Sequence, residues 1–215
     1  MSARSRIAFA SGVGGLAGAT LLLSGRFDAG VVVALLFVGG ARAAAPASVL
    51  DADRASSLPA TRSLTSQMWL APSWALIVAA GVVRAGSPAL ADARGANAAA
   101  GLAIGNGDPF AVAGAWFAVA AAVVAIASGP LLEDVPPSVQ RLEIGAVLGQ
   151  ALLVVTLFAG PQIVEGLDAV PWVAGIAVAA LVAWAARHIR VPYAPQVAFA
   201  LAAVGLGATI AGGAP

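Results

Sequence analysis

Long apolar runs, separated by short polar segments, dominate the chain. A helix needs roughly 20 mostly apolar residues to cross the hydrocarbon core of a bilayer. Seven stretches approach or reach that length, and the breaks between them hold most of the charged residues. The predicted spans are 7–24, 29–45, 67–85, 109–128, 142–160, 171–187 and 194–212. The pattern therefore predicts an all-α bundle of about seven transmembrane helices, forming a single integral membrane domain over residues 1–215.

The breaks between these spans are rich in turn-forming residues. Residues 46–66 combine charged residues with serine and threonine, and residues 129–141 contain the pair Pro136-Pro137. Neither proline can donate a backbone hydrogen bond to continue a preceding helix. Pro109 lies at the start of a predicted span, where a missing N–H costs little. We therefore expect 46–66 and 129–141 to be polar loops.

The first span has one feature of a secretory signal peptide, because Arg4 and Arg6 precede its apolar run. That run is about 17 residues long, whereas the apolar region of a signal peptide spans roughly 7–15. We expect a first transmembrane helix that is retained, and a cleaved signal is the alternative.

Composition agrees with a lipid environment. Hydrophobic residues make up 60% of the chain and charged residues 10%, compared with roughly 25% charged in soluble domains. The absence of cysteine excludes disulfides and thiolate-bound metal or iron–sulfur centres. A net charge of +1 provides no field that would attract nucleic acid.

The placement of the arginines predicts the orientation. All 11 basic residues are arginines. With the N-terminus inside, eight of them face the cytoplasm and three face outward, as the positive-inside rule requires. We predict an N-inside, C-outside protein of the cell membrane (plasma or inner membrane). Residues 46–66, 129–141 and 187–193 would then share the cytoplasmic face.

Ionisable residues inside a membrane are the first candidates for function. Glu143 lies just inside the fifth predicted span, and Gln150 follows seven residues later on roughly the same face. With Arg141 they form a candidate proton or ion path. The alternative is that Glu143 is an interfacial residue paired with Arg141 or another arginine. Arg42 and Arg84, at the ends of spans, are predicted to be snorkelling anchors.

Charged residues in the predicted cytoplasmic loops are candidates for docking a partner protein. Simple solvation is the alternative for the two adjacent acids, Glu133 and Asp134. His188 is the only histidine, and one histidine makes no metal site. No catalytic residue or metal ligand is therefore predicted. The docking candidates are Asp51, Asp53, Arg54, Arg62, Glu133, Asp134, Arg187, His188 and Arg190.

Four segments, taken together and in order, resemble one known family. It is the quinone-site membrane subunit (H subunit) of respiratory complex I, with its counterpart in membrane-bound nickel–iron hydrogenases and formate hydrogenlyase. The segments are Trp69-Leu70-Ala71-Pro72, Glu133 to Pro136 followed by Arg141 to Ile144, Val155 to Gly160, and Trp184 to Gln196. On this resemblance the chain looks like a reduced, divergent member.

The resemblance implies a membrane-anchoring, non-catalytic subunit of a complex I-like or membrane-bound hydrogenase-like ion-translocating assembly, in which any oxidoreductase activity would belong to the partners. Its partners would be antiporter-like membrane subunits and a peripheral cytoplasmic subunit. No cofactor is expected on this chain itself, and a quinone is the one ligand that the resemblance leaves open. The alternatives are a stand-alone small transporter or channel and a structural assembly factor.

Overall fold

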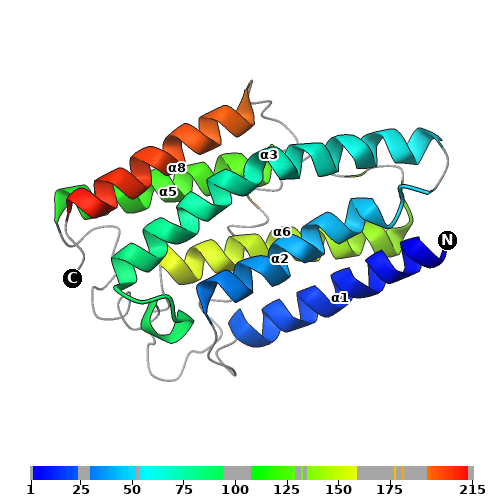
Figure 1. The fold of residues 1–215 in the computed structure, drawn as a ribbon, viewed down its shortest axis with the longest axis horizontal. Coiled ribbons are helices and arrows are strands. Elements are labelled where there is room, and N and C mark those ends of the chain that lie inside the picture. The colour runs from blue at the N-terminus through cyan, green and yellow to red at the C-terminus, as the bar shows by residue number, and fades with distance from the viewer. Residues whose placement is uncertain are drawn as a thin grey trace.

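The computed structural model describes residues 2–23, 30–51, 54–93, 108–128, 132, 135–158, 177, 181 and 193–212, with the side chains of 54–56 excepted. These residues form six long helices and no strand longer than an isolated bridge between Gly30 and Ala89. The helices are α1 (Ala3–Leu23), α2 (Val31–Ala47), α3 (Arg54–Ala85), α5 (Pro109–Ala127), α6 (Pro137–Phe158) and α8 (Ala194–Ala211). They run roughly along one axis and pack into a bundle (Figure 1).

The described part of the chain is a helical membrane bundle, as predicted. Five of its helices are long and apolar enough to cross a bilayer, and α2 is a shorter apolar helix of 17 residues. Apart from residues 177 and 181, the predicted span 171–187 lies outside the described residues.

The polar segment 46–66 is mostly helical, so the prediction of a long loop is wrong. Helix α2 continues to Ala47, and α3 begins at Arg54. The threonines join the helix because their hydroxyls bond its own backbone: Thr61 Oγ1 donates to the Ser57 carbonyl and Thr65 Oγ1 to the Thr61 carbonyl, each at 2.9 Å. Such bonds satisfy the hydroxyl within the helix, although they slightly destabilise it and often bend it.

Helix α3 is therefore longer than a bilayer requires. Its 32 residues span about 48 Å, against about 30 Å of hydrocarbon. The excess is the polar start of the helix, where Ala60 and Ser63 are buried and Leu58 and Arg62 are exposed. The first three to four turns of α3 thus form an amphipathic extension beyond the apolar span.

Helices α5 and α6 begin at prolines. Pro109 occupies the first turn of α5, and Asp108 caps it by accepting a hydrogen bond from the Phe110 N–H at 2.8 Å. Helix α6 begins at Pro137, five residues before the predicted start at 142. Proline can start a helix because the first N–H groups lack intrahelical partners. The loop predicted over 129–141 is thus shorter than expected.

Small residues set the closest helix contacts. Helices α5 and α8 lie against each other along their length (Figure 1). A Cβ on Gly205 of α8 would meet the backbone N of Ala118 at 2.9 Å and the backbone O of Gly114 at 3.0 Å. The two backbones approach this closely only because both positions are glycine.

The bundle has two distinct ends. The start of α1, the end of α2 and the starts of α3 and α6 gather at one end, on the right in Figure 1. There Ser2 Oγ donates a hydrogen bond to Asp51 Oδ2 at 2.6 Å. Helix α8 finishes at the opposite end, where Gly212 lies against Ala111 near the start of α5. The N-terminus and the α2–α3 and α5–α6 connections therefore share one end, here called the N-terminal end. That this end is cytoplasmic stays a prediction from the arginines.

Candidate functional site: a buried ion pair and an adjoining cavity

Two oppositely charged side chains lie inside the bundle near its N-terminal end. Arg42 comes from α2, five residues before the helix ends, and Glu143 comes from α6, six residues after it begins. Both lie roughly 8 Å along the axis from the helix end, at 1.5 Å per residue. The side chains are 4% and 0% exposed, and 3.9 Å separates Arg42 Nη2 from Glu143 Oε1.

Glu143 also holds the connection that precedes its own helix. Its Oε2 accepts a hydrogen bond from the backbone N–H of Leu132 at 3.0 Å. Leu132 is buried in a small apolar cluster at this end of the bundle. The cluster's other members are Ala45, Val49, Ala60, Val139 and Leu142. One carboxylate thereby joins α2, α6 and the α5–α6 connection.

The second oxygen of Glu143 is less constrained. No described residue makes a hydrogen bond to Oε1, and its 3.9 Å separation from Arg42 exceeds the roughly 2.7–3.2 Å of a direct N–H···O bond. A bridging water or a small side-chain movement would close that gap. The site can therefore accept a proton or a water at Oε1 while Oε2 stays bonded.

Such a pair is costly to bury. Removing two charges from water costs several kcal/mol per ion, and their attraction often fails to recover it. Ionisable groups inside membrane bundles accordingly mark functional paths more often than structural ones. The arrangement suits the transfer or storage of charge, because a proton on Glu143 would change its attraction to Arg42.

Helix α3 contacts the pair through Gln67. Its Nε2 donates to the backbone carbonyl of Arg42 at 3.2 Å and to Ser63 Oγ at 3.3 Å. Ser63 is fully buried. These bonds fix the amphipathic start of α3 against the end of α2 that carries the guanidinium.

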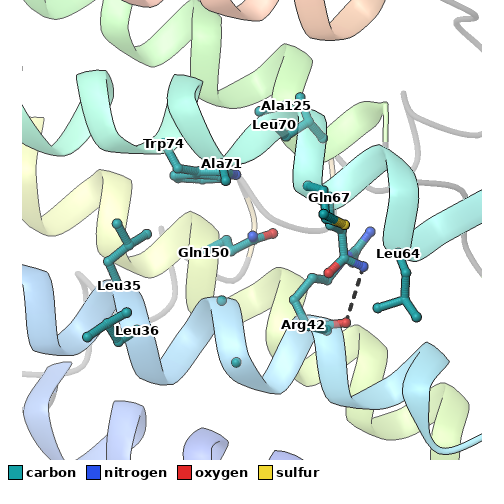
Figure 2. A pocket seen from close by; sticks show the side chains of 14 residues that line it. Leu35, Leu36, Arg42, Leu64, Gln67, Leu70, Ala71, Trp74, Ala125 and Gln150 are labelled. Carbon is teal, nitrogen blue, oxygen red and sulfur yellow. Dashed lines mark hydrogen bonds between the residues drawn. The ribbon is translucent and has the colours of Figure 1, made fainter.

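A cavity of about 350 Å³ adjoins the ion pair, between α2, α3 and α6. Figure 2 shows Arg42 and Gln67 near one end, Leu35, Leu36 and Trp74 near the other, and Gln150 between them. The remaining wall is mostly leucine, alanine and glycine. Most of this space is therefore apolar.

Of the predicted path residues, the structure places Glu143 and Gln150 at buried positions two turns apart on α6 and leaves Arg141 exposed. The partner of Glu143 is Arg42. The prediction that Arg42 is a snorkelling anchor is wrong, because it is 3% exposed and paired inside the bundle. Their role in ion movement stays a prediction.

The docking candidates divide into two groups. Asp51 and Arg62 are exposed at the N-terminal end. Arg54 begins α3, but its side chain lies outside the described residues. The others also lie outside them: Asp53, Glu133, Asp134, Arg187, His188 and Arg190.

Sequence reasoning missed Arg42, Ser63 and Gln67 as site residues. One signal for Arg42 was present: five small residues, Ala43 to Ala47, follow it, so the apolar run continues past the charge. An arginine inside a run, and not at its edge, predicts burial better than anchoring. Gln67 had no comparable signal, because its role depends on how α3 packs on α2.

The site thus consists of one buried cation, one buried carboxylate with a spare acceptor oxygen, and a largely apolar cavity beside them. This set can hold charge and admit an apolar molecule. No described group of histidine, cysteine, aspartate or glutamate could bind a metal ion. Comparisons of the chain with protein families, with curated proteins and with solved structures found no match.

Proposed function

We propose that this chain is a membrane-anchoring subunit of an ion-translocating assembly of the complex I or membrane-bound hydrogenase type. The observation that carries the proposal is the buried Arg42–Glu143 pair. A carboxylate opposed by a guanidinium below the polar end of a membrane bundle suits a proton or ion path that opens toward that end. The resemblance in sequence supplies the class of assembly.

The extension of α3 supports a docking role. It carries Arg62 and Leu58, which both lie outside the apolar span. Leu58 is 52% exposed. A helix segment that continues past the apolar span places polar and apolar side chains outside the lipid, where a peripheral protein can reach them. We propose that this surface binds the peripheral cytoplasmic subunit and that the membrane helices pack against antiporter-like subunits in the cell membrane.

Within that assembly Glu143 would carry the proton and Arg42 would set its charge state. In this proposal Arg42, and not Arg141, is the arginine that acts with Glu143. Because Glu143 also bonds the Leu132 N–H, a change in its charge would reach the α5–α6 connection. The ion pair would thus link proton occupancy to the shape of the N-terminal end.

The test is mild solubilisation of native membranes, followed by affinity purification of the full chain. We expect a multi-subunit complex containing antiporter-like and peripheral proteins. Recovery of the chain alone would contradict the proposal. Proton flux from the purified chain in liposomes would favour a stand-alone transporter in its place.

The variant Glu143→Gln separates the roles within the complex. Glutamine keeps an oxygen that can accept the Leu132 hydrogen bond but cannot carry the proton. We expect the complex to assemble and ion translocation to fall at least tenfold. Unchanged translocation would remove Glu143 from the path and leave an anchoring or assembly role.

A further inference from the structure

Gln150 presents its side-chain amide to the cavity between α2, α3 and α6. Gln150 is 6% exposed. Figure 2 shows its amide directed along the cavity toward Arg42 and Gln67. Within the described part of the chain, no hydrogen bond to this amide is found. A buried amide ordinarily has a partner, so a bound molecule is the simplest source of one.

Two glycines create the space that this amide faces. Gly39 and Gly40 of α2 both line the cavity, and a Cβ built on either would meet no atom within 4 Å. A larger side chain at Gly39 could therefore occupy part of the cavity. Two consecutive glycines also weaken a helix, and an open cavity is a reason to retain them.

The cavity opens on the outer surface of the bundle. Leu36 and Met68 contribute to its wall and are 68% and 76% exposed. Both lie on helices that pack side by side, so the mouth faces the bilayer between α2 and α3. A molecule dissolved in lipid can enter there without crossing water.

The polarity of the cavity follows the depth of the membrane. Arg42 lies near the N-terminal end, and Leu35 lies seven residues further in, about 10 Å deeper. The polar atoms of Arg42 and Gln67 therefore lie toward the interface, and Leu35 and Trp74 lie toward the middle of the bundle. Lipids of that leaflet have the same arrangement, with the headgroup outward and the chain inward.

We propose that this cavity binds a single-chain amphiphile whose headgroup is uncharged and hydrogen-bonds to Gln150. A hydroxyl matches the amide, because each can donate and accept. The charge of Arg42 is already opposed by Glu143, so a charged headgroup would bring an unbalanced charge into an apolar space. The chain lies along Leu35, Leu36 and Trp74. This site does not depend on the assembly proposed above.

Quenching of Trp74 tests the site directly. The full chain, in lipid nanodiscs, is titrated with a fatty alcohol that carries bromine at the end of its chain, since bromine quenches indole fluorescence on contact. Subtracting the signal of Trp74→Phe removes the other four of the five tryptophans. We expect saturable quenching, tighter for the alcohol than for the carboxylate or alkane of equal length.

Two pairs of variants assign the binding to this cavity. Gln150→Leu should reduce the preference for alcohol over alkane by roughly 2- to 12-fold, the range for one hydrogen bond, and Gln140→Leu at an exposed position of α6 should not. Gly39→Leu should abolish the Trp74 signal. Gly14→Leu, at an exposed position where a Cβ meets nothing within 4 Å, should preserve it. If Gly39→Leu does not fold, Gly40→Leu, at the adjacent glycine that also lines the cavity, is the second cavity-filling variant.

The proposal is overturned if the carboxylate binds more tightly than the alcohol, if Gln150→Leu keeps the preference, or if the cavity-filling variant binds as the parent does. A chain that binds the alcohol but purifies without partners would contradict only the proposed function. A complex that does not bind the alcohol would contradict only the proposed amphiphile site.

Discussion

Arg42 and Glu143 approach each other from α2 and α6, helices separated by about a hundred residues of sequence, with 3.9 Å between Nη2 and Oε1 and almost no exposed surface on either side chain. Each charge is thus tolerated because of the other. The effect on stability of removing one charge should therefore differ from the effect of removing both.

The first prediction is a double-mutant cycle on this pair. Glu143→Leu should lower the free energy of unfolding by about 3–5 kcal/mol, because it leaves a buried guanidinium uncompensated. Adding Arg42→Met should recover most of that loss, since apolar residues often replace a buried pair at little cost. Denaturant unfolding in detergent measures both. Simple additivity of the two single changes would contradict the coupling.

The second prediction compares two glycines on α8. Gly205→Ala should destabilise by about 1–3 kcal/mol, because its Cβ would press on the backbone of α5 and such overpacking is costly. Gly207→Ala meets nothing within 4 Å and should stabilise by about 0.5–1 kcal/mol through helix propensity. Thermal unfolding of the matched pair gives the sign of each effect. Equal shifts would mean that α5 and α8 are not in close contact.

The third prediction concerns the capping of α5. Asp108→Ala should cost about 0.5–2 kcal/mol, because it removes the acceptor for the Phe110 N–H, which lies 2.8 Å from Asp108 Oδ1. Asp108→Asn keeps an acceptor and should cost less. The exposed Asp92→Ala serves as a control, expected within about 0.5 kcal/mol of the parent. A thermal shift assay in detergent distinguishes the three.

The fourth prediction tests orientation and the extension of α3 together. Because the chain has no cysteine, single cysteines can be read without background. Thr61→Cys should react with a membrane-impermeant maleimide only from the cytoplasmic side, and Ser87→Cys only from outside. Val204→Cys, 51% exposed near the middle of α8, should react from neither side, since a thiolate needs water. Reversed labelling of the first two would invert the topology.

The apolar runs were enough to predict most spans. The predicted 109–128 and 194–212 agree with α5 and α8 to within a residue at each end, because a proline lies in the first turn of each helix. The other boundaries were less accurate wherever polar residues continue a helix, as Ser63 and Thr65 do in α3. Hydropathy reports the surrounding solvent, and a helix can leave the lipid without ending.

The ion pair could be predicted only in part. Glu143 was recognisable as a carboxylate inside an apolar span, and its burial agrees with that expectation. Its partner was not predictable, because the choice between Arg42 and Arg141 depends on how α2 and α6 lie side by side. Arg141 is only two residues away, yet two positions along a helix differ by about 200° in direction, so it faces outward.

The continuity of α3 has a mechanical consequence. Its outer turns, with Leu58 and Arg62, and its inner turns, with the buried Ile77, belong to one uninterrupted helix. Pro59 and Pro72 each remove a backbone hydrogen bond, and a proline inside a helix bends it; Figure 1 shows α3 bent partway along its length. A molecule that bound the outer turns of α3 would therefore act on the same helix whose inner turns contact α5 and α8, and the bend is the place where the two segments could change their angle.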